Sequence, residues 1–80
     1  MSNIRSEDLK IITGVEAYEA WTGKKVKNKG LSIIHETYFT AVYIEHIPTG
    51  TRAYCNDYES HIKNRDKALS IIMGSLLNDN

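Results

Sequence analysis

The sequence has one cysteine, one proline and no surplus of either charge. Because Cys55 is alone, an intramolecular disulfide and a cysteine-rich zinc site are excluded, which fits a reducing compartment. Ten basic residues balance ten acidic ones, which excludes a uniformly basic, histone-like or polybasic membrane-binding protein. No apolar run approaches the roughly 20 residues of a membrane span, and the N-terminus lacks a signal-peptide pattern. We therefore expect a cytoplasmic protein without a membrane partner.

Length and composition predict one small folded domain. The chain has 80 residues, of which 41% are hydrophobic and 25% charged, a composition too apolar for a disordered tail. We expect a single domain over residues 1–80, with a polar, flexible segment at residues 1–7. A chain of this size buries a small core, so we expect neither a large pocket nor a bound cofactor.

The first half of the chain alternates between strand-like and helix-like patterns. Residues 8–13 are rich in β-branched side chains and predict a strand. Residues 15–21 have helical spacing, and Gly23 suits the C-cap of a short helix. The β-forming residues at 31–47 predict a further strand, with a bend near residues 35–37 because an unbroken strand would be too long.

The second half predicts a hairpin followed by a helix. Pro48 and Gly50 mark a turn, and residues 51–56 form its second strand, with Ala53 and Cys55 on the inward face. Beyond the hairpin, an N-cap at Asp57 or Ser60 opens a helix that covers the sheet. Its predicted apolar stripe is Ile62, Ala68, Leu69, Ile72, Met73 and Leu76. The expected fold is α+β, a small antiparallel or mixed sheet with a β-hairpin and a C-terminal helix packed on it.

A basic loop is the first candidate binding site. Residues 23–30 are predicted to be exposed, and they carry four lysines and no acid: Lys24, Lys25, Lys27 and Lys29. With Trp21 beside them, they combine cations with an aromatic platform, the pairing that holds unpaired nucleotides. The alternative is that Trp21 belongs to the core and the lysines keep the loop soluble.

The start of the final helix is a second candidate. Ser60, Lys63, Asn64 and Lys67 recur at helical spacing and form a polar stripe beside the unpaired N–H groups of the helix start. Such a stripe suits phosphate, whereas a solvated helix face is the alternative.

The three histidines give a weaker, catalytic hypothesis. His35, His46 and His61, with Glu36 and Glu45 nearby in sequence, could serve as acid and base in a small ribonuclease. Neighbouring strand residues point to opposite faces, however, so these are not preassembled pairs. The chain has no Cys/His cluster with metal-ligand spacing and no glycine-rich phosphate loop, and Cys55 fits a small buried hydrophobe better than a nucleophile.

Two stretches carry a family resemblance. Residues 41–50 read AVYIEHIPTG, and residues 55–70 read CNDYESHIKNRDKALS. They resemble the catalytic domain of class I peptide chain release factors, which has roughly AVRITHLPTG, then a cysteine and DERSQHKNKAKAL. The resemblance reaches from residue 41 to about residue 77, and DLKIIT at residues 8–13 is similar to the family's first strand. It implies the family's fold and a surface for the ribosome or tRNA. Residues at the family's helix start are matched by Ser60, Lys63, Asn64, Arg65 and Lys67.

The chain departs from the family at the catalytic loop. In the family, a glycine-glycine-glutamine loop enters the peptidyl transferase centre and assists hydrolysis of peptidyl-tRNA. The corresponding positions fall near Leu31, Ser32 and Ile33, and no Gly-Gly-Gln occurs in these 80 residues. The resemblance therefore does not carry over hydrolysis, and we do not expect an enzyme.

Three hypotheses follow. The leading one is a non-hydrolytic, release-factor-like RNA-binding protein that acts on structured RNA, the ribosome or tRNA, to modulate translation or tRNA maturation. The second is a protein-interaction module, an inhibitor or adaptor of a translation or RNA-decay factor. It would dock through exposed aromatic residues, namely Tyr38, Phe39, Tyr43 and Tyr54. The third is a small tRNA-processing nuclease that uses His46 or His61.

Overall fold

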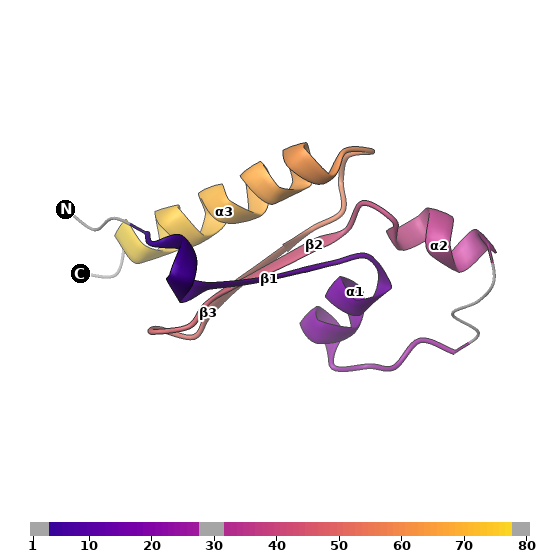
Figure 1. The fold of residues 1–80 in the computed structure, drawn as a ribbon, viewed down its shortest axis with the longest axis horizontal. Helices are drawn as coiled ribbons and strands as arrows, with labels where there is room; N and C mark the ends of the chain where they lie inside the picture. The colour runs from indigo at the N-terminus through magenta and orange to yellow at the C-terminus, as the bar shows by residue number, and fades with distance from the viewer. Residues whose placement is uncertain (1–3, 28–31, 78–80) are drawn as a thin grey trace.

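The computed structural model describes residues 4–27 and 32–77, which form an antiparallel sheet with helices on both of its faces (Figure 1). Its elements, in chain order, are η1 (Ser6–Asp8, a 3-10 helix), β1 (Leu9–Thr13), α1 (Val15–Thr22), α2 (Ser32–Tyr38), β2 (Val42–His46), β3 (Thr51–Cys55) and α3 (His61–Leu77). The predicted α+β fold, a sheet with a β-hairpin and a C-terminal helix, is confirmed.

The sheet has the order β1-β2-β3, and both strand pairs are antiparallel. The predicted turn joins β2 to β3. The N–H of Gly50 donates to the carbonyl of His46 at 2.8 Å, and Gly50 has a φ of 74°, which a residue without a Cβ adopts most easily. This turn sets His46 opposite Thr51 and, at the far end of the hairpin, Val42 opposite Cys55.

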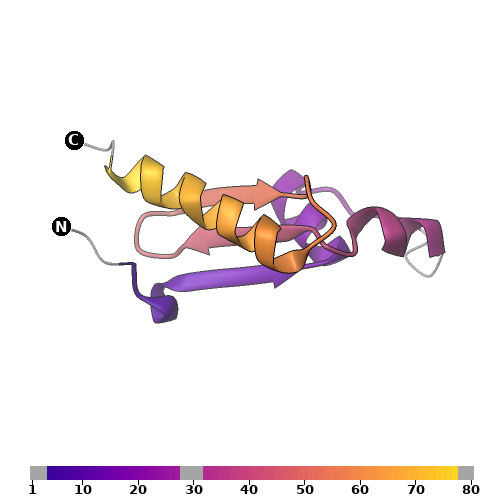
Figure 2. The ribbon, with the colours of Figure 1, turned by 90° about the horizontal axis from the view of Figure 1, so that it is seen from above.

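Alternate residues of the strands face α3, which lies along one face of the sheet (Figure 2). The buried residues between them are Val42, Ile44, Ala53 and Cys55 from the strands and Ala68 and Ile72 from the helix. The inward placement of Ala53 and Cys55 is confirmed. Burying several aliphatic side chains at about 1.5–3 kcal/mol each makes this layer the main hydrophobic contribution to stability.

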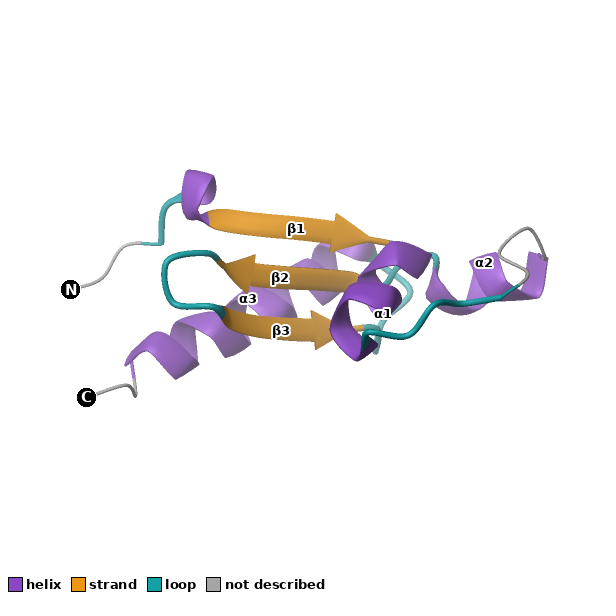
Figure 3. Ribbon diagram, turned by 90° about the horizontal axis from the view of Figure 1, so that it is seen from below, coloured by secondary structure: helices purple, strands orange, loops and turns teal. Residues whose placement is uncertain are grey.

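The opposite face of the sheet carries α1 over one end only (Figure 3). Tyr43 is buried there with Ala17 and Ala41, and the half-buried Tyr38 and Tyr54 pack beside them. Because α1 ends at Thr22, the part of this face nearest the hairpin turn has no helix over it.

The strand expected within residues 31–38 is instead the helix α2, and the reason is topological. β1 ends at Thr13, opposite Val42, and the N–H of Gly14 then donates to the carbonyl of Ala41 at 3.0 Å. β3 ends opposite Val42 as well, so residues before Ala41 have no strand to pair with. A helix satisfies their backbone groups internally, and the Tyr38 ring lies 4.5 Å from the ring of Tyr18 on α1.

One further expectation needs correction. In the predicted apolar stripe of α3, Ile62 and Met73 are exposed, while the buried positions of the helix are Asn64, Ala68 and Ile72. Of the segment expected to be flexible, residues 1–3 lie outside the described residues, and Ile4 packs on the core.

Candidate nucleic-acid interface

The described lysines of the basic loop are exposed, and the backbone that carries them is held in place. Gly23 is the C-cap of α1, with a φ of 76°, and its N–H donates to the carbonyl of Glu19 at 2.8 Å. The Glu19 carboxylate accepts a hydrogen bond from the N–H of Val26 at 2.8 Å. Lys24, Lys25 and Lys27 thus extend from an anchored turn into solvent, whereas Lys29 lies outside the described residues.

Trp21 lies at the surface rather than in the core. Its ring stacks on Tyr54 with centroids 5.9 Å apart and planes 10° apart, and its side chain is 39% exposed. The alternative that assigned Trp21 to the core is therefore wrong. The exposed loop lysines follow Trp21 by a few residues along the chain, and their combination with this ring in one binding site stays a prediction.

Arg52 is a cation of this surface that the sequence pattern did not single out. Its guanidinium carbon lies 5.1 Å from the centroid of Trp21 and 5.9 Å from that of Tyr43. Tyr43 in turn donates to the Glu45 carboxylate at 2.8 Å. The sequence does contain a signal that could have identified Arg52. Strand alternation places Arg52 and Tyr54 together on the face opposite Ala53.

The buried part of this aromatic cluster affects titration. Burial, and after it the nearby Tyr38 and Tyr18, raise the pKa of Tyr54 to about 12. The unfolded chain loses this proton near pH 10. Stability from Tyr54 is therefore complete below about pH 10 and lost as the pH rises towards about 12. We expect urea unfolding to show a steeper alkaline loss of stability in the wild type than in Tyr54→Phe; equal losses would contradict this assignment.

The second candidate site, the polar stripe at the start of α3, is only partly available to a phosphate. Ser60 is the N-cap, because its Oγ accepts a hydrogen bond from the N–H of Lys63 at 3.3 Å. Lys63 is exposed. Lys67 donates to Asp57 at 2.8 Å, and this contact lowers the pKa of Asp57 and raises that of Lys67. Arg65 pairs with its neighbour Asp66 at 3.2 Å, so two of the three cations already have an acidic partner.

Asn64 does not belong to the exposed stripe, because its side chain is fully buried. Its Nδ2 donates to the carbonyls of Thr40 at 2.6 Å and Tyr58 at 2.9 Å. Its Oδ1 accepts from the N–H of Tyr58 at 2.9 Å and from the thiol of Cys55 at 3.3 Å. Helical periodicity places Asn64 on the same polar stripe as Ser60 and Lys67, but it does not show that the side chain faces inward. Asn64 is thus a structural residue that ties α3 to the segment after α2, and it is not available to a partner.

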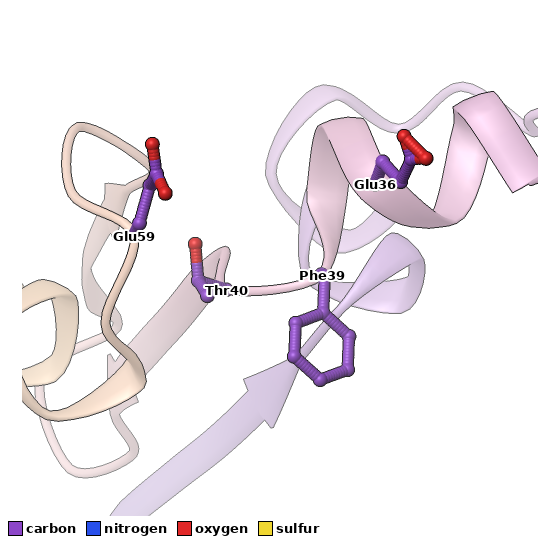
Figure 4. Close-up of a pocket in the computed structure, with 4 residues that line it drawn as sticks. All are labelled: Glu36, Phe39, Thr40 and Glu59. Atoms are coloured by element: carbon purple, nitrogen blue, oxygen red, sulfur yellow. The ribbon is translucent and has the colours of Figure 1, made fainter.

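An acidic pocket of about 490 Å³ lies between α2 and the loop before α3 (Figure 4). Glu36 and Glu59 come from its two sides, Thr40 lies between them, and Phe39 points away from both carboxylates. Phe39 is 64% exposed. Two carboxylates at the rim make this end of the molecule unfavourable for phosphate.

The predicted site residues fall on two surfaces that the sheet separates. α3 lies on one face, and α1 with the loop after it lies on the other (Figure 1). The histidines are not brought together either, because His46 lies beside the hairpin turn and His61 begins α3 beyond the other end of β3. The side chain of His35 lies outside the described part of the structure.

Metal-binding clusters and membrane-spanning helices are both absent from residues 4–27 and 32–77. These ranges contain no group of three or more His, Cys, Asp or Glu side chains placed to hold a metal ion. Within the same ranges, no helix has the length and apolar character that crossing a membrane requires.

The expected exposure of the aromatic residues is only partly met. Tyr43 is 3% exposed, so the expectation that it is available for docking is wrong. Tyr38 and Tyr54 are half-buried and pack against the same cluster. Phe39 is the one member of that predicted set that is well exposed.

Comparison with known proteins finds similarity to one kind of protein. No protein-family model matches the chain. It is 46% identical over 50 residues to peptide chain release factor 1 of Alkaliphilus oremlandii, a match that covers 62% of this chain. The corresponding proteins of Desulfitobacterium hafniense and Thermus thermophilus are 47% and 50% identical over 38 residues, or 48% of this chain. The chain spans 13% of the first relative's length and 11% of the other two. Part of this chain is thus similar in sequence to a short segment of peptide chain release factor 1.

Proposed function

We propose that this chain is a release-factor-like module that binds structured RNA, either tRNA or the ribosome, and acts in translation or tRNA maturation without hydrolysing peptidyl-tRNA. The observation that carries the proposal is the sequence similarity to release factor 1 of three bacteria. A segment similar in sequence to part of release factor 1 supports a related binding partner.

The structure supports a binding role more than a catalytic one. Four residues that match the family's motifs have structural roles in this chain. Gly50 forms the hairpin turn and Ser60 caps α3, while Cys55 and Asn64 are buried against each other. Of the positions that the sequence resemblance aligns with the family's catalytic tripeptide, Ser32 and Ile33 lie at the start of α2. The absence of Gly-Gly-Gln from these 80 residues is the reason for proposing binding without hydrolysis.

The charge distribution favours the loop after α1 as the main contact. Lys24, Lys25 and Lys27 are exposed and none of them has an acidic partner among the described residues. At the start of α3, Arg65 and Lys67 are already paired. Exposed cations without acidic partners bind phosphate more readily, because no internal ion pair must break first.

The experiment is a binding titration against purified tRNA and ribosomes over a series of salt concentrations. For contacts with the phosphate backbone we expect log affinity to fall linearly with log salt, with a slope of about −0.7 to −0.9 per phosphate contacted. Removing Arg5, an exposed cation that pairs with Glu7 far from the loop, serves as the control and should leave the slope unchanged. Absence of binding at low salt, or binding without salt dependence, would refute the proposal.

A further inference from the structure

Where α1 ends, the sheet face opposite α3 carries an aromatic stack with an arginine beside it. Tyr54 of β3 supports one side of the Trp21 ring, and Arg52 of the same strand lies against that ring. Trp21 keeps 39% of its surface exposed although it is the chain's only tryptophan and a large apolar side chain. Leaving such a ring at the surface forgoes burial energy, which is typical of binding sites.

Arg52 has Glu45 directly opposite it on β2, but the two form no ion pair among the described residues. None of the ion pairs in the described part of the chain involves Arg52. Its hydrogen bond to the carbonyl of Ala20 is long, at 3.4 Å. A planar guanidinium beside an aromatic ring provides a stacking surface together with hydrogen-bond donors for a phosphate. A lysine ammonium has the donors but not the stacking surface.

The lysine loop begins two residues after Trp21 in the sequence. Gly23 reverses the chain after α1, and Lys24 follows it with its N–H held by the hydroxyl of Thr22 at 3.2 Å. Lys24 and Lys25 are therefore fixed within a few residues of Trp21. A flat aromatic surface next to cations at this spacing fits a nucleotide whose base is not paired.

We propose that Trp21 and Arg52 form a stacking site for an unpaired base, with the neighbouring phosphate bound by Lys24 and Lys25. This inference rests on the proposed RNA binding and makes it specific. The site takes the splayed base of a loop, bulge or strand end and does not take a continuous duplex, whose bases cannot reach the ring.

Because Trp21 is the only tryptophan, its fluorescence reports on the site directly. We expect a short single-stranded oligoribonucleotide to quench this fluorescence, and a blunt duplex of the same length or an acidic peptide to leave it largely unchanged. Base stacking is worth about 1–3 kcal/mol, so Trp21→Ala should weaken single-strand binding roughly five- to hundredfold. Trp21→Phe should recover part of that loss.

Matched variants separate stacking from charge. Arg52→Lys keeps the charge and should still weaken single-strand binding, whereas Phe39→Ala removes a more exposed aromatic residue from the acidic end and should not. If RNA binds but Trp21→Ala binds as wild type does, the stacking site is wrong while RNA binding stands. If the duplex or the acidic peptide quenches as strongly as the single strand, the assignment to an unpaired base is wrong. If no RNA binds at all, both proposals fail.

Discussion

Replacing Asn64 with alanine should lower the free energy of unfolding by about 2–4 kcal/mol. The side chain is fully buried and its amide makes four hydrogen bonds, three of them to backbone groups. Alanine would leave the carbonyl of Thr40 and the N–H of Tyr58 without these partners in a partly buried site. An 80-residue domain is stable by roughly 4–12 kcal/mol, so the loss is a large share of the total.

Urea denaturation measures this effect, and Asn56→Ala is the matched control. Asn56 makes one side-chain hydrogen bond, to the carbonyl of Thr37 at 2.9 Å near the surface, so its replacement should cost about 1 kcal/mol or less. Asn64→Asp is a second test. Its carboxylate would face the carbonyls of Thr40 and Tyr58, so that this variant should be more stable at acid pH, where a protonated carboxyl can donate, than at neutral pH. Equal, small losses for Asn64→Ala and Asn56→Ala would show that Asn64 does not hold α3 to the segment after α2.

Replacing all four loop lysines with alanine should weaken RNA binding roughly a hundredfold to a thousandfold at low salt. A lysine that contacts a phosphate contributes about 1 kcal/mol in water, and three or four such contacts add up to that change. The salt dependence should also become shallower, by about 0.7–0.9 for each phosphate that a lysine no longer neutralises. The four positions are Lys24, Lys25, Lys27 and Lys29. The same titration with tRNA measures both quantities.

The matched control removes three cations from the other face of the sheet. A variant with Lys63, Arg65 and Lys67 replaced by alanine loses similar charge, but two of those side chains are already paired with acids. We expect it to bind RNA several-fold more tightly than the loop variant. A larger loss of affinity in the α3 variant would place the RNA on the face of the sheet that carries α3.

The sequence predicted those parts of the fold that local patterns determine. Pro48 and Gly50 specify the hairpin turn, and Gly23 specifies the end of α1, because each needs a backbone conformation that few other residues adopt. The region of α2 could not be predicted in this way. Ile33 and Ile34 favour a strand, but β1 and β3 both end opposite Val42 and leave that segment without a strand to join.

The sequence predicted which residues of the candidate site carry charge, but it did not predict which of its side chains are buried. Lys24 and Lys25 stand out in the sequence, since the loop contains no acid. In the sequence, Asn64 and Lys63 are both polar residues on the same stripe of the predicted helix. Helical spacing does not show which of them faces the sheet. The burial of Asn64 follows from its hydrogen bonds to Cys55 and Thr40, which the spacing does not predict. The partnership of Arg52 with Trp21 joins residues far apart in sequence, and it exists only because α1 packs across the hairpin.

The most direct test of the whole account is crosslinking of the chain to RNA in its host cells, followed by sequencing of the bound RNA. If this chain is a translational RNA-binding module, fragments of tRNA or ribosomal RNA should be enriched with the wild type and largely lost with the variant that lacks the four loop lysines. Recovery of no RNA above background, or of the same RNA with both proteins, would contradict it.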